Sequence, residues 1–175
     1  MEREPQYVRE YAIEFGTLGP TAFQVKYRGS VLVGVGLVAT VADRPLSWKR
    51  RTLGAIPEEG VHETDTLVGR VWRIRKGEGA QRGAAIMVGQ SADNDILLPE
   101  YTVSTHHLSF GFDAAGMSIT DLGSLNGTKV DGVLVEPHSV FRIKDRQQIT
   151  IGRICFDYLA SESFVDTVRR ESERR

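Results

Sequence analysis

Hydroxyl, amide and carboxylate side chains gather in two short segments of this 175-residue chain, Ser104–His107 and Asp121–Thr128. The hydroxyl of Ser104 can donate a hydrogen bond to an acceptor such as a phosphate oxygen. Asn126 and Gly127 both tolerate positive φ, so they allow a tight turn that leaves the Asn126 amide available to a peptide backbone. The chemistry that these residues offer is hydrogen bonding to another protein.

Catalysis fits the same residues less well than binding does. Ser104, His107 and Asp121 are the residue types of a hydrolytic triad, but no serine of the chain lies in the G-x-S-x-G turn that presents such a nucleophile. His106 and His107 are adjacent, so on a strand their rings point to opposite faces and cannot readily bind one metal ion. We therefore expect neither an enzyme nor a metal site.

A glycine-rich segment earlier in the chain resembles a dinucleotide-binding turn. Residues 34–39 read GVGLVA, but such a turn binds pyrophosphate only at the start of a helix. Pro45 follows too soon for a helix of useful length. We therefore expect no nucleotide cofactor, and no other cofactor is indicated.

The composition indicates a protein that meets its partners through local contacts. The 22 Lys and Arg residues nearly balance the 23 Asp and Glu residues, so the chain lacks the positive field that draws proteins to nucleic acid or to an anionic membrane. The single cysteine, Cys155, excludes an internal disulfide framework and suits a reducing compartment. The N-terminus is charged and lacks the apolar run of a signal peptide, so we expect a cytoplasmic protein.

Short alternating segments between Thr66 and Leu159 predict the strands that position these residues. Gly, Asn or Asp lies between most of the segments, and Asp113–Gly116 and Asp131–Gly132 both favour hairpin turns. The segments read TLVGRVWRIRK, AAIMVGQ, DILL, HLSFGFD, MSITDLG, GTKV, VLVE, VFRIK, QQITIG and ICFDYL. Many short strands at this spacing are typical of a β-sandwich. We therefore predict a mainly β fold of short, mostly antiparallel strands.

The N-terminal part of the chain predicts a small α/β extension. Apolar and aromatic residues favour an amphipathic helix over Pro5–Phe15, which Gly16 would end. Thr21 is the candidate cap of a second helix that reaches Tyr27. The β-branched run Val31–Val41 then predicts one or two strands. Because these apolar residues would otherwise face water, we expect them to pack on the sandwich or on a partner chain.

The chain divides into an N-terminal extension, a β-sandwich and a short C-terminal helix, at residues 1–65, 66–160 and 161–175. The last part of the extension, residues 42–65, has little periodicity, so we expect a connection there. Ser161 is the candidate cap of the C-terminal helix, which places Phe164, Val165 and Val168 on one face.

In order, spacing and strand context, three motifs resemble those of the forkhead-associated (FHA) domain, a β-sandwich that binds phosphothreonine peptides. They are N-D-I at 94–96, S-x-x-H at 104–107 and D-L-G-S-x-N-G-T at 121–128. The resemblance covers roughly residues 66–160. The helix-and-strand extension is also similar to segments that precede FHA domains in bacterial regulatory proteins.

The resemblance implies roles for individual residues. The positions that bind the peptide or phosphopeptide are Gln90, Ser104, Thr105, Leu125 and Asn126. The positions that support the site are Gly89, His107, Asp121, Ser124 and Gly127. In the family, the histidine at the position of His107 supports the site from beneath, and we expect the same role here.

Three peptide-binding positions depart from the residues usual in the family. Gln90 replaces an arginine that grips the phosphate, Thr105 stands where Arg, Lys or Asn is common, and Leu125 often has a threonine in its place. A charge-assisted hydrogen bond contributes about 1.5–3 kcal/mol, so losing the arginine alone would weaken phosphopeptide binding roughly ten- to a hundredfold. The candidate substitute cations are Lys129, Arg82 and a protonated His106.

Two functions remain open. In the first, which we favour, the domain is a signalling or scaffolding module that docks an unmodified protein, or a second copy of itself, with weakened or lost dependence on phosphothreonine. In the second, it reads threonine-phosphorylated peptides downstream of a Ser/Thr kinase and uses a substitute cation. We expect neither nucleic acid nor a membrane as a partner.

Overall fold

The computed structural model describes residues 6–38, 67–77, 81 and 83–174. The helices in this part of the chain are α1 (Val8–Leu18), α2 (Pro20–Lys26) and α5 (Ser161–Glu173). The strands are β1 (Val31–Leu37), β2 (Val71–Arg73), β3 (Ile86–Gly89), β4 (Ile96–Leu97), β5 (Leu108–Asp113), β6 (Gly116–Asp121), β7 (Thr128–Val130), β8 (Val133–Leu134), β9 (Val140–Arg142), β10 (Gln148–Ile151) and β11 (Ile154–Leu159).

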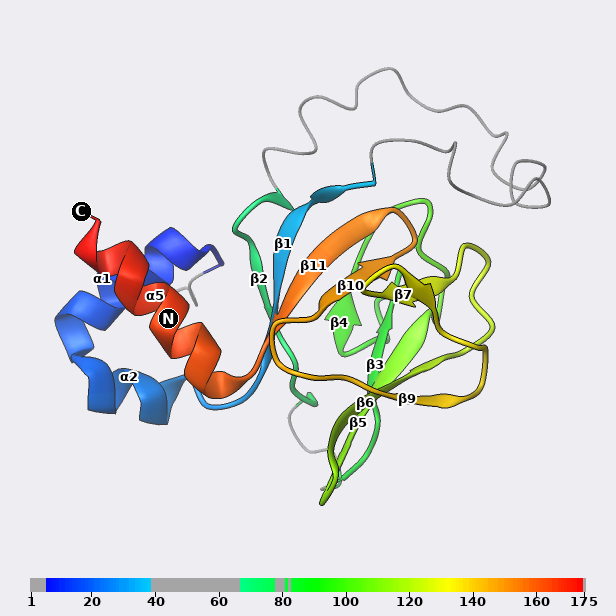
Figure 1. Ribbon diagram of the computed structural model, residues 1–175, viewed down its shortest axis with the longest axis horizontal. Coiled ribbons are helices and arrows are strands. Elements are labelled where there is room, and N and C mark those ends of the chain that lie inside the picture. The colour runs from blue at the N-terminus through cyan, green and yellow to red at the C-terminus, as the bar shows by residue number, and fades with distance from the viewer. Residues whose placement is uncertain (1–5, 39–66, 78–80, 82, 175) are drawn as a thin grey trace.

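The strands form two sheets that pack on each other (Figure 1). The six-stranded sheet has the order β2-β1-β11-β10-β7-β8, and the five-stranded sheet has the order β4-β3-β5-β6-β9. Leu32 and Phe156 of the first sheet share a buried core with Phe110 and Ile119 of the second. The predicted β-sandwich is therefore confirmed.

The strand segments predicted from residue alternation are confirmed as well. Nine of the ten contain one of the strands from β2 to β11 in full, and the segment MSITDLG contains all of β6 except its first residue, Gly116. Asp113–Gly116 closes the hairpin between β5 and β6, and Asp131 and Gly132 join β7 to β8. Asp131 and Gly132 have φ values of 47° and 80°, as a two-residue hairpin turn requires.

β1 shows that the N-terminal extension supplies an inner strand of the sandwich. It lies between β11 and β2 and pairs with both in antiparallel register. Its side chains alternate, because Leu32 enters the sandwich core while Val31 and Val33 enter a second apolar cluster on the other face. The expectation that this segment packs on the sandwich is confirmed.

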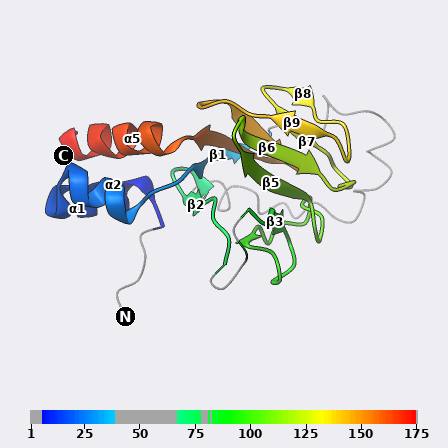
Figure 2. The same ribbon diagram turned by 90° about the horizontal axis from the view of Figure 1, so that it is seen from below.

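The second cluster joins the three helices, which lie together to one side of the sandwich (Figure 2), to strands β1, β2 and β11 of the six-stranded sheet. Tyr11 of α1 is 1% exposed. Its ring contacts Tyr27 and Phe164 edge-on, with centroid separations of 5.0 and 5.1 Å. Val165 and Val168 of α5 are buried in the same cluster, so the predicted apolar face of the C-terminal helix is confirmed.

The prediction that Gly16 ends the first helix is wrong. α1 continues to Leu18 and ends at Gly19, whose φ of 75° is the conformation that glycine adopts at low cost. A Cβ on Gly16 would lie 3.9 Å from the hydroxyl of Ser172, so α5 runs alongside α1 at this point. The buried contacts of α1 with α5 outweigh the cost of about 1 kcal/mol for a glycine inside a helix.

The predicted caps of the other two helices are also wrong. α2 begins at Pro20 with Gly19 as its N-cap, so Thr21 lies inside the first turn. α5 begins at Ser161, and its N-cap, Ala160, has no capping side chain. Instead, the carboxylate of Asp145 accepts hydrogen bonds from the Ala160 amide and the Ser163 hydroxyl. A residue from a distant loop therefore serves this helix end.

Part of the N-terminal prediction lies outside the described residues. This holds for the end of the Val31–Val41 run after Val38 and for the predicted connection at 42–65. In the part of the chain that the structure describes, no helix has the length and apolar character to cross a membrane.

Candidate functional site

The five predicted peptide-binding residues come together at one end of the sandwich. We call this set the loop rim: Gln90, Ser104, Thr105, Leu125 and Asn126. It lies opposite the tip of the β5–β6 hairpin, which projects at the bottom of Figure 1. The backbone amide of Gln90 donates to the Ser104 carbonyl at 3.0 Å, and the backbone amide of Leu125 donates to the Ser104 hydroxyl oxygen at 2.9 Å. Ser104 therefore joins the loops that follow β3 and β6.

His107 holds the loop rim from below. Its side chain is fully buried; Nδ1 accepts from the Ser104 amide at 3.0 Å, and Nε2 donates to the Gly127 carbonyl at 3.1 Å. Because a backbone amide can only donate, the ring proton must lie on Nε2, and the ring is neutral. Burial lowers the pKa of His107, against the opposing effects of the Gly127 carbonyl and Asp121. This geometry is that of a structural support.

Asp121 organises the loop between β6 and β7. Its Oδ1 accepts from the amides of Gly123 and Ser124, and its Oδ2 accepts from the hydroxyls of Ser124 and Thr128. Burial alone would raise the pKa of Asp121, but these hydrogen bonds outweigh it and hold the pKa below its usual value. Ser124 also accepts from the Gly127 amide at 3.0 Å. Asp121 and Ser124 therefore stabilise the turn, as predicted from their residue types.

The two predicted supporting glycines are required for different reasons. A Cβ on Gly89 would lie 2.2 Å from the Thr105 carbonyl oxygen, so the two backbones approach too closely for any side chain. Gly127 has a φ of 77°, and a Cβ there would lie 3.1 Å from Cδ1 of Leu134. Both glycines allow the loops to close on each other.

Asn126 differs from the expectation of a free amide. Its Nδ2 donates to the Thr102 carbonyl at 2.7 Å, so the amide nitrogen already ties two loops together. Its Oδ1 is buried and has no hydrogen-bond partner among the described residues. A buried acceptor without a partner costs about 1–3 kcal/mol. Asn126 therefore combines a structural contact with an unused acceptor at the loop rim.

The loop rim carries little positive charge. Gln90 is exposed, and its side-chain amide makes one long contact, 3.4 Å, to the backbone carbonyl of Glu100. Leu125 is 47% exposed, and Thr105 is exposed as well. His106 contacts Asn94 at 3.2 Å and Asp93 at 3.6 Å, so its ring lies against residues outside the loop rim. Of the other two candidate cations, Lys129 lies on β7, where it pairs with Thr150 of β10 and Leu134 of β8. Arg82 lies outside the described residues.

Sequence reasoning missed an ion pair next to the loop rim. The Nε of Arg153, which lies in the β10–β11 turn, donates to Glu100 at 2.7 Å. Glu100 and Arg153 are 53 residues apart, so no spacing rule could have joined them. The backbone amide of Arg153 also donates to the hydroxyl of Thr102 at 3.0 Å.

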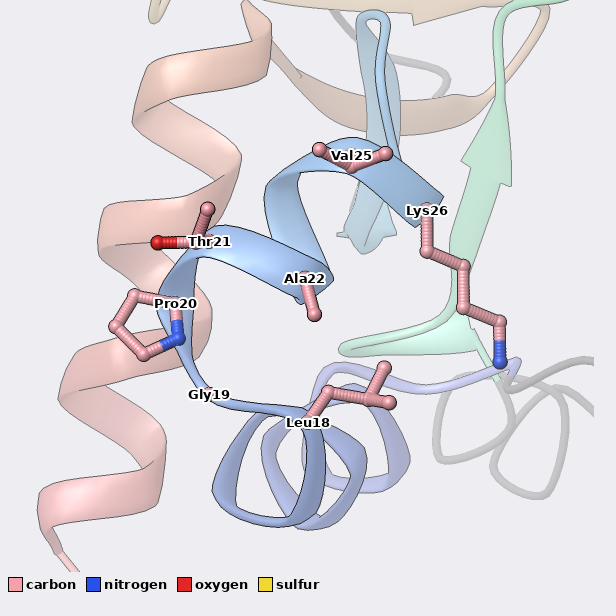
Figure 3. A pocket seen from close by; sticks show the side chains of 7 residues that line it. All are labelled: Leu18, Gly19, Pro20, Thr21, Ala22, Val25 and Lys26. Atoms are coloured by element: carbon pink, nitrogen blue, oxygen red, sulfur yellow. The ribbon is translucent and has the colours of Figure 1, made fainter.

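A surface pocket lies elsewhere, between the end of α1 and α2 (Figure 3). It has a volume of about 530 Å³ and is lined mainly by apolar and small residues. Its one charged side chain, Lys26, is paired with Glu14. None of the predicted site residues lines this pocket. Within the described ranges, no three His, Cys, Asp or Glu side chains gather in a way that could hold a metal ion.

Part of the chain is similar in sequence to known bacterial proteins. The chain is 37% identical over 70 residues to an ABC transporter ATP-binding/permease protein of Mycobacterium tuberculosis, which covers 40% of this chain and 8% of that protein. It is 33% identical over 72 residues to the oxoglutarate dehydrogenase inhibitor of Corynebacterium glutamicum, which covers 41% of this chain and 48% of that relative. The chain thus matches about half or less of these relatives' lengths.

A solved FHA domain of an Arabidopsis thaliana hypothetical protein has 18% sequence identity and a TM-score of 0.49, covering 91% of this chain and 93% of that one. The family model of the FHA domain matches residues 86–152. This range contains β3 to β10 and all ten residues predicted for the site. The chain therefore contains an FHA domain.

Proposed function

We propose that this chain is a regulatory interaction module of the FHA type, which binds a segment of another protein at the loop rim with a weakened dependence on phosphothreonine. The observation that carries the proposal is an organised loop rim in which the exposed, uncharged Gln90 follows Gly89, at the position where the FHA resemblance implies an arginine. We further propose that the module binds without catalysing a reaction and works in the cytoplasm, which its single cysteine suits.

Preorganisation of the loop rim supports a binding role. The Ser104 amide is held by His107, and the Ser104 hydroxyl oxygen accepts from Leu125. Loops that are already ordered lose less conformational entropy when a partner binds. The Ser104 hydroxyl hydrogen has no acceptor among the described residues, so it can donate to a partner.

The charge at the loop rim supports weak dependence on phosphate. A phosphothreonine carries about -1.5 to -2 charges at neutral pH. The neutral amide of Gln90 contributes about 0.5–1.5 kcal/mol through a hydrogen bond, against about 1.5–3 kcal/mol for a charged donor. Leu125, nearly half exposed, favours an apolar contact with the partner in place of one to a phosphate.

The names of two relatives support a regulatory role. One is the oxoglutarate dehydrogenase inhibitor of Corynebacterium glutamicum, and the other is a glycogen accumulation regulator of Mycolicibacterium smegmatis, 30% identical over 79 residues. The first name describes an inhibitor of an enzyme, and the second describes a regulator. We extend to this chain only the class of activity, which is control by binding a protein partner.

A peptide titration tests the proposal. The probes are a phosphothreonine peptide library, randomised around the phosphothreonine, and the same library with threonine. We expect phosphorylation to raise the affinity of the unaltered chain less than about tenfold, because the main charged donor is absent. A larger gain that Ser104→Ala abolishes would overturn the proposal and establish a phosphothreonine reader.

Gln90→Arg is the complementary variant. It restores a guanidinium at the phosphate-gripping position and should raise the preference for the phosphorylated library roughly ten- to a hundredfold. Gln81→Arg makes the same change of charge in the turn before β3 and serves as the matched control. An equal response of the two variants would show that net charge alone, and not the loop rim, sets the preference.

A further inference from the structure

Two exposed leucines lie at the Asn126–Gly127 turn of the loop rim. Leu125 comes directly before the turn and is 47% exposed, and Leu134 of β8 is 62% exposed. A Cβ on Gly127 would lie 3.1 Å from Cδ1 of Leu134, so the Leu134 side chain lies against this turn. We call the side chains of Leu125 and Leu134 the leucine patch. It extends the loop rim toward β8 with apolar surface.

The backbone beneath the leucine patch is held in place. The backbone amide of Leu125 donates to the Ser104 hydroxyl oxygen at 2.9 Å, and the Gly127 carbonyl accepts from Nε2 of His107 at 3.1 Å. β8 pairs with β7, the strand that follows the turn, in antiparallel register. A patch on an ordered backbone loses little conformational entropy when a partner covers it.

Val133, the other residue of β8, shows that exposure alone does not define the patch. Leu134 pairs with Lys129 and Val133 pairs with Val130 of the buried core. Because successive side chains of a strand point to opposite faces, Val133 points away from the face that carries Leu134. It is 59% exposed. Val133 is therefore an apolar residue of similar exposure outside the leucine patch.

The size of the leucine patch decides what can cover it. A stable protein–protein interface buries about 800 Å² per partner, and two partly exposed leucine side chains supply only a small part of that area. The patch is therefore too small to bind a second folded copy by itself. It matches one apolar side chain of a segment that also receives the free hydroxyl hydrogen of Ser104.

We propose that the leucine patch selects the partner: the segment bound at the loop rim carries an apolar side chain, such as Leu, Ile, Met or Phe, that packs against Leu125 and Leu134. The inference rests on the proposed function, since it names the class of segment that the loop rim binds. Packing removes apolar surface of both proteins from water. A charged side chain at this place would lose hydration without gaining a hydrogen-bond partner, so the patch also disfavours charged segments.

Selection from the threonine peptide library with the full chain tests the inference. We expect apolar residues to be enriched at one randomised position in the bound pool. Leu134→Ser should reduce this enrichment about three- to tenfold, because covering the exposed part of Leu134 contributes about half of what burying a whole leucine does. Leu134→Met keeps an apolar side chain of similar volume and should retain the enrichment.

Val133→Ser is the matched control and should also retain the enrichment. The inference is overturned if the bound pool shows no apolar preference, or if Val133→Ser reduces the preference as much as Leu134→Ser does. Peptide binding without an apolar preference would leave the proposed function intact. Conversely, a phosphorylation gain above about tenfold, together with an apolar preference that Leu134→Ser reduces, would refute the weak phosphate dependence and support the patch.

Sedimentation and circular dichroism complete the test. We expect the unaltered chain and Leu134→Ser to have the same oligomeric state. Self-association that Leu134→Ser abolishes would show that a second copy covers the leucine patch, and it would overturn the inference. Because Leu134 is exposed on an edge strand, Leu134→Ser should melt close to the unaltered chain. If it does not fold, Leu125→Thr replaces it and should reduce the apolar enrichment in the same way.

Discussion

Stability below neutral pH should depend on His107. Its ring is buried and neutral, with an acceptor nitrogen facing the Ser104 amide and a donor nitrogen facing the Gly127 carbonyl. Burial disfavours the charged ring and holds the pKa of folded His107 below the usual histidine value of 6.5. Protonation would also place a second donor against the Ser104 amide. The unfolded chain takes up the proton first, so stability is complete above the unfolded pKa and falls as the pH drops below it.

The size of the loss follows from this difference in proton uptake. If the folded ring stays neutral throughout, the free energy of unfolding falls by about 1.4 kcal/mol between about pH 7.5 and pH 5.5, because the unfolded histidine titrates near 6.5. This value is an upper limit for one histidine. Asp121 contributes in a separate, more acidic window. Its folded-state pKa is lowered, so its contribution to stability is complete above the usual aspartate pKa and is lost as the pH falls from there through the lowered folded-state pKa.

Urea unfolding at the two pH values measures the effect. His107→Gln should be less stable at both values and should lose much less stability on acidification than the unaltered chain, because glutamine does not titrate. His138→Gln, which replaces an exposed histidine, should keep the original pH dependence. The reasoning is refuted if the unaltered chain and His107→Gln lose the same free energy between the two pH values.

Three further changes test how the loops and the sandwich are held together. Asp121→Asn, which replaces a carboxylate accepting four hydrogen bonds, should lower the free energy of unfolding by about 1–3 kcal/mol in urea, and a loss below about 0.5 kcal/mol would contradict this. Gly89→Ala should cost about 1–3 kcal/mol or more, because its Cβ would lie 2.2 Å from the Thr105 oxygen, whereas Gly16→Ala, inside a helix, should stabilise by about 0.5–1 kcal/mol; equal effects would refute the packing argument. Deletion of residues 1–60 removes β1 from the middle of its sheet and should abolish the cooperative thermal transition in circular dichroism, so an unchanged melting temperature would show that the segment is an independent appendage.

Much of the sandwich could be predicted from local patterns. Residue alternation and turn residues located every strand from β2 to β11, because a half-exposed strand must alternate its side chains and a tight hairpin needs residues that adopt positive φ. The five rim residues chosen from the motif spacing lie in loops that hydrogen-bond to one another, and their role in binding stays a prediction. The roles of His107 and Asp121 followed from the family resemblance and the residue types, and their hydrogen bonds agree with those roles.

Other features depend on residues far apart in the chain, which local patterns do not relate. β1 is an inner strand because β11 and β2 pair with it from both sides, and α1 passes through Gly16 because α5 packs against it. Asp145 caps α5 from another loop, in place of the expected Ser161. The net charge beside the loop rim also depends on residues that are far apart in the chain, Glu100 and Arg153.

The sequence alone indicates only that glutamine follows Gly89 where the FHA family usually has arginine. The fold adds that Arg153 approaches from the β10–β11 turn and that Glu100 neutralises it at 2.7 Å. Spacing along a strand or helix reports backbone geometry over a few residues. The electrostatic character of a loop cluster instead depends on which distant side chains the packed sheets bring within hydrogen-bond distance.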